Sequence, residues 1–569
     1  LKTLRFQAER VHDFAWVACP DYVGSDTTWA GIEVSALVFR EDAAKWREIK
    51  AQTVDALRHH TKLVGPYVWP RFTATEAYCG GGAMEYPMLV MDEPAMYSAL
   101  FHSLDDTNAH EVGHEWCYGM LGSDERAHPW MDEGFTQYIE HDYSDTKYPR
   151  GLFGYVDRFP WVGRISALDL DEQYYLARAW ARDERPIATP ADGHPGYPTY
   201  GVAAYAKPAS MLHTLRGMVG DSLFTEFLHV YYRRNLLRHP RPPDVIRAAD
   251  DATGQDLAPF FRSWVETLDR PSFALGGIHR ERAGTDYRTS VVVVRKEAMV
   301  LPVTVEATFA DGTRQERRVL ARERGTPAVF ESRSPVRSAR LDPRHEIIEM
   351  DRLDNGSGTL PPMRFHFLAG FPSAEAIGVA CGPTIWHGEE EGLRLGGWMD
   401  GRYLPSTDFP YGIRGFEGGL SIGTSDGSVA YRAGGWRRVS ALGARSRLRT
   451  LVARDEGLFR VGLHAENAAM APARRHPYRS WKLSVEYRDR YKVDPVDSRY
   501  WSRGPTWNAG LTLGLETIGP RRKERIEISY RRGAASALRG KDDAAPDANY
   551  DWLRLSAKQD IDPLPARLK

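Results

Sequence analysis

The amino-acid sequence predicts a multidomain α+β protein. Apolar residues recur at helical spacing over 42–62 and 212–268, which predicts helices in the first half of the chain. They alternate with period two over 276–350, which predicts a β-sandwich, and again in many short segments after the Gly-, Asn-, Ser- and Pro-containing linker 353–361. We therefore expect three domains, at residues 1–272, 273–352 and 363–569.

Composition excludes some classes of function. The chain has 569 residues, 42% of them apolar, and a net charge of -1. This charge balance does not indicate a nucleic-acid partner. No apolar run reaches about 18 residues, so no transmembrane helix is expected. The cysteines are far apart and indicate neither a disulfide framework nor a thiolate zinc site; they are Cys19, Cys79, Cys117 and Cys381.

The start of the chain reads as short strands. Residues 14–18 and 31–39 are apolar stretches separated by turn residues. The chain begins at Leu1 in what reads as the end of a strand-rich region, so we expect a preceding domain outside this sequence. A helix is then expected over 42–62, with Asp42 as its cap.

A glycine-rich stretch follows. Residues 80–82 are glycines, which let a backbone approach a ligand closely. Residues 84–90 read as an edge strand, where Pro87 is tolerated. Because free N–H and C=O groups of an edge strand can pair with an extended peptide, Gly82, Ala83 and Met84 are predicted to contact substrate. The alternative is a glycine loop beside a purely structural strand.

The pattern His110-Glu111-Val112-Gly113-His114 predicts a metal site on a helix. Histidines at i and i+4 lie one above the other on one helix face, where both can bind one zinc ion. Glu111 lies beside the first ligand and can take a proton from a water activated by zinc. Packing alone does not explain two histidines and a glutamate at this spacing.

A third ligand follows in Trp130-Met131-Asp132-Glu133-Gly134-Phe135. Catalytic zinc keeps three protein ligands and one open position, and Glu133 supplies the third. Gly119 and Gly122 can end the first helix, so that a second helix returns beside it. We predict one Zn²⁺ per chain on His110, His114 and Glu133. His128 is a rival ligand, but its spacing fits neither helix face.

These two motifs, HEVGHEW and WMDEGF, resemble those of the gluzincin zinc aminopeptidases, the family that includes membrane alanyl aminopeptidase. The resemblance extends over roughly the first 270 residues. It implies a thermolysin-like, mostly helical catalytic domain with a small β-sheet over residues 1–272, including remnant strands of an N-terminal β-domain. It also implies peptide substrates.

Two further stretches resemble motifs of this family in the same order. Glu85 matches the glutamate of a Gly-x-Met-Glu-Asn motif that binds the α-ammonium group of the substrate, although Tyr86 replaces the asparagine. Such a carboxylate would select peptides with a free N-terminus.

The other stretch resembles the family's Tyr-x-Lys-Gly-Ala motif. Tyr205 matches the tyrosine, whose hydroxyl would stabilise the oxyanion, while Pro208 replaces the glycine. Tyr200 is the alternative for this role, and ordinary packing remains the alternative for either ring.

Within the predicted sandwich, Val303, Val305, Ala307 and Phe309 alternate with polar residues, and Asp311-Gly312 predicts a tight hairpin turn. Residues 291–294, 319–321 and 347–350 are further predicted strands. The resemblance agrees with this reading, since the gluzincin family often has such a module after its catalytic domain.

Residues 363–569 contain many alternating segments, among them 393–399, 429–436, 448–452, 459–463, 481–488, 511–516 and 526–530. Segments of this kind resemble strands of outer-membrane β-barrels, in which lipid-facing apolar residues alternate with polar ones. A soluble β-sandwich or barrel alternates in the same way and remains the alternative. The first reading implies membrane contact and a location in the cell envelope, at the periplasm or outer membrane.

Two hypotheses for function follow. In the first, the protein is a zinc-dependent aminopeptidase in which Glu111 and Tyr205 are catalytic and Glu85 binds the substrate amine. In the second, it is an outer-membrane barrel or β-rich binding protein whose zinc domain is accessory or of the endopeptidase type. The two hypotheses are compatible, because a barrel could tether a peptidase.

Overall fold

The computed structural model divides the chain into two compact units, Leu1–Leu176 with Glu184–Pro361, and Ala177–Asp183 with Pro362–Lys569. The protein is a mixed α+β multidomain protein with a large β-rich C-terminal region. The predicted three-domain division stays a prediction. The structure describes residues 3, 5–80, 82–152, 165–368, 373–388, 392–404, 414–443, 446–455, 458–467, 478–490, 504–519, 522–535 and 548–561.

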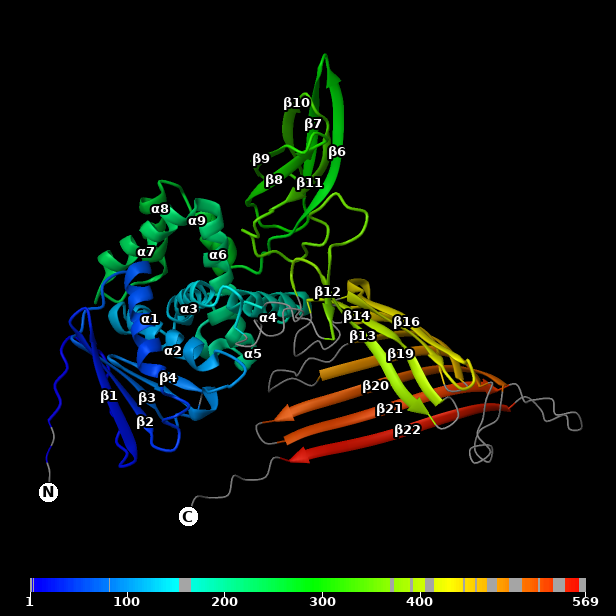
Figure 1. Ribbon diagram of the computed structural model, residues 1–569, viewed down its shortest axis with the longest axis horizontal. Coiled ribbons are helices and arrows are strands. Elements are labelled where there is room, and N and C mark those ends of the chain that lie inside the picture. Colours follow the sequence, from blue (N-terminus) through cyan, green and yellow to red (C-terminus); the bar gives the residue numbers. More distant parts are fainter. Residues whose placement is uncertain are drawn as a thin grey trace, which may run out of the picture. The chain divides into compact units, whose positions relative to one another are not determined.

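The first unit contains a five-stranded sheet of order β1-β2-β3-β5-β4 (Figure 1). Its strands are β1 (Tyr22–Trp29), β2 (Ile32–Phe39), β3 (Arg71–Glu76), β4 (Ala83–Tyr86) and β5 (Leu89–Asp92). Residues 14–18 form no strand, so that prediction is wrong. The strand predicted over 84–90 is also wrong as a single element, because the chain turns at Pro87 and Met88 to form the β4–β5 hairpin. Strand β4 lies at the edge of the sheet, as predicted.

Helices pack against this sheet and make up about a third of the first unit. They are α1 (Ile49–Leu63), α2 (Ser103–His114), α3 (Glu133–Lys147), α4 (Ala167–Ala181), α5 (Tyr197–Tyr200), α6 (Lys207–Val219), α7 (Asp221–Asn235), α8 (Pro242–Thr253) and α9 (Ala258–Val265), with α4 continuing into the second unit. The predicted start of α1 is wrong, since Asp42 lies in a turn that accepts backbone bonds from Lys45 and Trp46. In the described residues, no helix is long and apolar enough to cross a membrane.

Short helical segments extend or separate these helices. Two are π-helical, η2 (Glu115–Met120), which continues α2, and η5 (Gly201–Ala206), which precedes α6. The others are 3₁₀ turns, η1 (Pro94–Met96), η3 (Pro129–Met131), η4 (Ala191–Gly193) and η6 (Ser440–Leu442). Helices α1, α2 and α3 pack side by side, and the sheet lies against α1 and α2 (Figure 1).

Two three-stranded sheets follow in the first unit, of order β10-β7-β6 and β11-β8-β9. Their strands are β6 (Phe273–Ala283), β7 (Asp286–Arg295), β8 (Pro302–Phe309), β9 (Arg314–Leu320), β10 (Gly325–Ser332) and β11 (Val336–Leu341). The predicted turn at Asp311-Gly312 is confirmed, and Gly312 has the positive φ of 88° that a glycine accommodates. The predicted strand 347–350 is wrong: this buried segment is irregular and bonds to Thr214 and Pro271.

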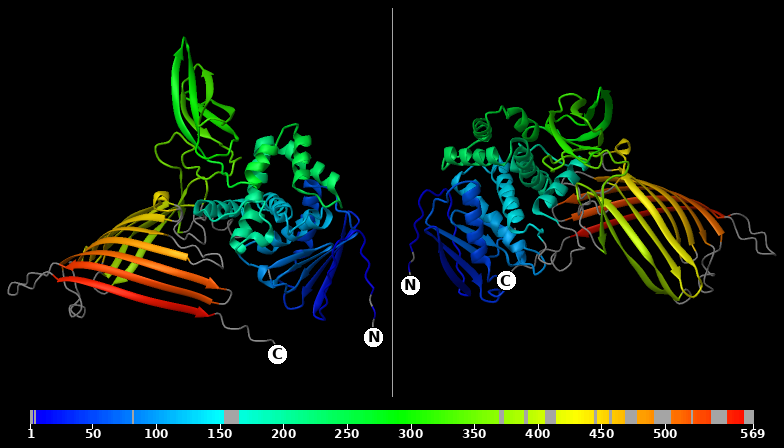
Figure 2. Two further views of the ribbon diagram at one scale, coloured as in Figure 1. Left: turned by 180° about the vertical axis from the view of Figure 1, so that it is seen from behind. Right: turned by 45° about the horizontal axis from the view of Figure 1, so that its top comes forward.

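The second unit is one eleven-stranded sheet in sequential order. Its strands are β12 (Met363–Phe367), β13 (Ile377–Gly388), β14 (Gly392–Tyr403), β15 (Arg414–Gly423), β16 (Val429–Arg438), β17 (Ser446–Asp455), β18 (Leu458–Asn467), β19 (Tyr478–Arg490), β20 (Gly504–Gly519), β21 (Arg522–Ala535) and β22 (Ala548–Ile561). All neighbours are antiparallel except β12 and β13. The sheet is strongly curved (Figure 2). The alternating segments predicted here are confirmed as strands, and among the described residues no pairing joins β22 to β12 or β13.

Candidate metal centre

Two glycines let the elements of the site approach one another. A Cβ at Gly113 on α2 would lie 3.0 Å from Thr136 Cγ2 on α3, and a Cβ at Gly134 would lie 2.5 Å from Pro208 Cγ. Because real Cβ atoms essentially never lie so close, Gly134 lets α3 pack directly against the segment that carries Tyr205. Pro208, where the family motif has glycine, is the residue that Gly134 contacts.

The three predicted ligands lie together. His110 Nε2 lies 3.1 Å from His114 Nε2, and Glu133 Oε2 lies 3.5 Å and 3.3 Å from these two nitrogens. A tetrahedral zinc ion with bonds of about 2.0–2.1 Å holds its ligand atoms about 3.3–3.4 Å apart. The triangle of donor atoms therefore has the size that one zinc ion requires.

Two carboxylates orient the histidine rings from behind. His110 Nδ1 lies 2.9 Å from Glu140 Oε2, and His114 Nδ1 lies 2.6 Å from Asp132 Oδ1. A proton held at Nδ1 in these contacts leaves the Nε2 lone pair free for a metal, which is the usual arrangement around zinc-bound histidines. Asp132 and Glu140 were not predicted from the sequence. Asp132 directly precedes the ligand Glu133, and Glu140 follows Glu133 by seven positions, which is two helical turns on the same face of α3. Helix geometry could therefore have identified both residues as neighbours of the metal site.

Two buried carboxylate oxygens at the centre have no hydrogen-bond donor among the described residues. Among the described residues, neither Glu133 Oε2 nor Glu111 Oε2 has a hydrogen-bond partner, and both atoms are buried. An unpaired anionic oxygen is costly in this setting unless a cation is close. This observation, together with the two imidazoles and the carboxylate, fits zinc at this position.

Glu111 is buried beside the ligand triangle. Its carboxyl oxygen, one from Glu85 and a ring nitrogen of His114 all lie within 4.8 Å of one another. Burial raises the pKa of Glu111 to about 7, against the opposing effect of His110 and His114. A carboxyl group with a pKa in this range can both accept and return a proton near neutral pH.

Tyr205 reaches the centre from η5. Its hydroxyl donates a hydrogen bond to Glu133 Oε1, and its ring stacks 5.9 Å from the ring of His110. Burial and the neighbouring Glu133 carboxylate hold the pKa of the Tyr205 hydroxyl above its usual value, so this group stays protonated and can donate. Tyr200, the alternative, packs against Tyr205 with ring centroids 5.9 Å apart. His128 belongs to none of the potential metal-binding groups of the described residues.

Strand β4 forms the other side of the centre. Glu85 is buried there, and its Oε1 lies 3.9 Å from His114 Nδ1. Of its neighbours, Gly82 has a φ of 108° and accepts a backbone bond from Glu93, while the side chain of Met84 is exposed. Ala83 begins the strand. The central glycine of the predicted stretch, Gly81, lies outside the described residues.

Glu115 connects β4 to the histidine helix. Both of its carboxylate oxygens accept from the backbone N–H of Met88, at 3.1 Å and 3.0 Å, in the β4–β5 turn. Met88 has a positive φ of 68°, so this turn depends on such support. Since Glu115 directly follows His114, the bond sets the distance between Glu85 and the ligands. This role could not be predicted from the sequence, because no local pattern indicates a bond between Met88 and Glu115, which lie 27 positions apart.

Further carboxylates surround Glu85. Oxygen atoms of Glu85, Glu125 and Asp132 lie within 4.8 Å of one another. The region next to the ligand triangle is therefore strongly acidic, and it complements a cationic group.

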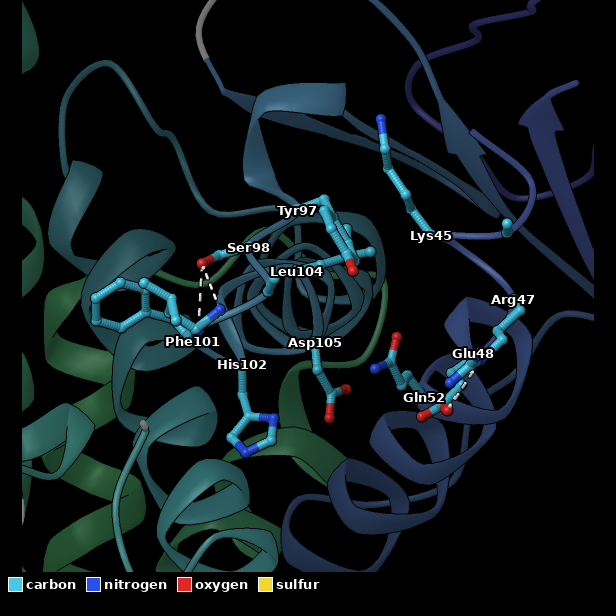
Figure 3. A pocket seen from close by; sticks show the side chains of 13 residues that line it. Lys45, Arg47, Glu48, Gln52, Tyr97, Ser98, Phe101, His102, Leu104 and Asp105 are labelled. Carbon is cyan, nitrogen blue, oxygen red and sulfur yellow. Dashed lines mark hydrogen bonds and ion pairs between the residues drawn. The ribbon is translucent and has the colours of Figure 1, made fainter. Parts of the chain in front are cut away.

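A separate pocket of about 340 Å³ lies at the beginning of α2. Figure 3 shows His102, Asp105, Glu48 and Lys45 around it. Asp105 is held by Tyr143, which donates to it at 2.9 Å. None of the predicted site residues lines this pocket, so it is distinct from the metal centre.

Comparisons with known proteins agree with this geometry. Residues 51–264 match the family model described as "Peptidase family M1 domain". Leucine aminopeptidase 2 of Aspergillus clavatus is 24% identical over 190 residues, which are 33% of this chain and 29% of that protein. Aminopeptidase M1 of Arabidopsis thaliana is 23% identical over 265 residues, 44% of this chain and 28% of that protein. Aminopeptidase N of Streptomyces lividans is 22% identical over 257 residues, 44% and 26% respectively.

The chain thus spans less than a third of the length of these relatives. Among solved structures, aminopeptidase A of Legionella pneumophila in complex with aspartic acid aligns with a TM-score of 0.44 and 14% identity, over 58% of this chain and 38% of that one. The family match contains the ligand triangle, Glu85, Glu111 and Tyr205. Residues 51–264 are therefore similar to a peptidase family M1 domain.

Proposed function

We propose that the protein is a zinc-dependent aminopeptidase that removes residues from the free N-terminus of peptides. The observation that carries this proposal is the ligand triangle of His110, His114 and Glu133 with the buried Glu85 beside it. The names of the relatives, which are aminopeptidases, support the same class of reaction.

His110, His114 and Glu133 would hold one Zn²⁺ per chain in a thermolysin-like arrangement. When bound, zinc supplies a Lewis acid that polarises a carbonyl group and lowers the pKa of water. Asp132 and Glu140 keep the two imidazoles in the orientation that zinc needs, because each holds a ring at Nδ1.

Glu111 and Tyr205 perform the proton and charge chemistry. Glu111 accepts a proton from the attacking water and passes it to the leaving amine, which its raised pKa permits. The Tyr205 hydroxyl, which donates to Glu133 in this structure, turns to the carbonyl oxygen as negative charge develops there. The hydrogen bond between Tyr205 and the ligand Glu133 supports this role for the hydroxyl.

Glu85 makes the enzyme an exopeptidase. Its carboxylate, with Glu125 and Asp132 close by, offers a negative site for the α-ammonium group of a substrate. The free edge of β4, with Gly82, Ala83 and Met84, pairs with the extended substrate backbone. A substrate whose amine sits at Glu85 then presents its first peptide bond to Glu111.

The experiment that tests this proposal compares free and N-acetylated forms of one peptide. We expect cleavage of the free form only, and we expect Glu85→Gln to raise KM for it about 10- to 100-fold, which is the loss of one charge-assisted contact of about 1.5–3 kcal/mol. The control is Glu33→Gln on β2, an exposed glutamate paired with Arg71, which should leave KM unchanged. Cleavage of the acetylated peptide at an internal bond would instead make the protein an endopeptidase.

We also propose that the protein works in the cell envelope. Support comes from the second unit, whose sheet exposes apolar side chains that would be unfavourable in water.

A further inference from the structure

The sheet of the second unit has an inverted distribution of side chains. On β18, Leu463 is 47% exposed, and on β20 and β22 Leu513 and Leu555 are 50% and 72% exposed. Polar residues on the opposite face are less exposed, with Arg394 at 6% and Ser529 at 9%. A sheet in water shows the reverse, with apolar residues inside and polar ones outside.

The register places the exposed apolar residues on one face. Leu513 pairs with Ile528, and Ile528 pairs with Leu555, so the three side chains form a row across β20, β21 and β22. Leu463 pairs with Val485 in the same way across β18 and β19. Paired residues of antiparallel strands point to the same face, so these rows form one continuous apolar surface.

The opposite face holds ion pairs that cross the strands. Glu417 on β15 lies 2.6 Å from Arg449 on β17 and 3.4 Å from Arg432 on the strand between them. Glu466 on β18 pairs with Arg447 on β17. Such pairs lie on the face opposite to the exposed apolar rows.

The apolar surface is large. Nine neighbouring strands, β14–β22, span about 38 Å at about 4.8 Å per strand, and strands of this length are more than about 30 Å long. A surface on the order of 1,000 Å² exceeds the roughly 800 Å² that one partner contributes to a standard protein interface. Each of the antiparallel strands β13–β22 has at least 10 residues, and the shortest, β15 to β18, have 10. A tilted strand crosses the hydrocarbon core of a bilayer with about 9–11 residues.

We propose that a phospholipid bilayer covers this face, with acyl chains against the row of Leu513, Ile528 and Leu555 and the row of Leu463 and Val485. Acyl chains are the occupant that matches a continuous apolar surface on a sheet whose opposite face carries the ion pairs. In the bilayer the edge strands must also be paired, because lipid cannot satisfy free N–H and C=O groups. Consecutive strands from β13 to β22 alternate in direction, so β13 and β22 are antiparallel. Strand β12 pairs only with Ile377–Cys381 of β13 among the described residues, so Gly382–Gly388 can pair with β22.

The test uses the full chain and vesicles of phosphatidylethanolamine and phosphatidylglycerol, with flotation in a density gradient at low and high salt. We expect wild-type protein to float at both salt concentrations, because an apolar contact is not screened. Leu463→Lys should lower the partition coefficient about 30-fold or more, since Leu463 lies in the middle of β18, where a lipid-facing lysine is least favourable.

The matched control is His464→Lys, the next residue on the same strand, which faces the polar side near Glu466 and Glu486. It should float like wild type. Far-UV circular dichroism and protease resistance of both variants establish that each is folded. In an unboiled gel sample, the lipid-bound wild type should migrate faster than the boiled one.

Three results would overturn the proposal. They are a monodisperse wild-type protein that stays soluble without detergent and does not float, a discrete dimer in light scattering that Leu463→Lys dissociates, and equal loss of flotation in both folded lysine variants. The second result would assign the face to another copy of the chain.

Discussion

Strands β8 and β18 share one sequence pattern and have opposite burial. On β8, Val303 and Val305 alternate with polar residues and are completely buried. On β18, Val461 and Leu463 alternate in the same way and are exposed. Period-two alternation therefore identifies a strand and its two faces, but the medium on the apolar side depends on what the rest of the molecule places there.

The same contrast holds for charged groups. In the first unit, buried charges converge on one point, where the rings of His110 and His114 contact the carboxylates of Glu133, Glu140 and Asp132. In the second unit, charges are distributed along the inner face of the sheet in separate pairs such as Glu417 with Arg449. Convergent charges indicate a binding site for a cation, whereas distributed ion pairs indicate the polar face of a sheet.

Removing the metal should give the largest difference between the two units. A zinc chelator is expected to reduce aminopeptidase activity to the level of the blank, because the zinc ion that the ligand triangle would hold supplies the Lewis acid. The strand signal in circular dichroism and flotation with vesicles should persist, since the sheet contains none of the three ligands. Activity should return with added Zn²⁺. Loss of flotation together with activity would show that the two regions are coupled.

Glu111→Gln should have the next largest effect. We expect kcat to fall about 100- to 10,000-fold, because the amide cannot accept the proton. Zinc content should not change, since Glu111 is not in the ligand triangle. The neighbouring Glu115→Gln is the comparison, because it alters the β4–β5 turn and not the proton acceptor. Full activity in Glu111→Gln would refute the mechanism.

Tyr205→Phe should reduce kcat about 100- to 1000-fold, with KM little changed, because it removes one donor to the oxyanion. Tyr200→Phe is the matched control, as its ring packs on Tyr205 and the Glu133 contact belongs to Tyr205. If Tyr200→Phe shows the larger loss, the two assignments must be exchanged.

Of these changes, Asp132→Asn should have the smallest effect. We expect zinc affinity to fall about 10- to 100-fold, because the amide orients the His114 ring less firmly. Competition with a chromogenic chelator measures this change. At saturating zinc most of the activity should return, and a loss that zinc cannot restore would place Asp132 in the reaction itself.

Much of the centre could be predicted because its chemistry is local. His110 and His114 lie one helical turn apart, so their shared face follows from helix geometry alone. Glu133 required one further step, the return of a second helix, which the glycines before it indicated. Glu115 and Met88 could not be paired in this way, since their bond depends on how the β4–β5 hairpin meets α2.

The errors in the fold have physical causes too. Pro87 and Met88 read as the middle of a strand, yet Pro87 cannot donate a backbone hydrogen bond and the chain turns there. Residues 347–350 are mostly apolar and predict a strand, but the segment is irregular and bonds to Thr214 on α6 instead of to another strand. In both cases tertiary contacts decided between conformations that the local pattern left open.

Metal content tests the central claim most directly. Elemental analysis of the purified chain should give one zinc per chain, and the double variant His110→Ala/His114→Ala should contain none while keeping its circular dichroism spectrum. Equal zinc content in the wild type and the folded double variant would contradict the account, because the ion would then be held somewhere other than between α2 and α3.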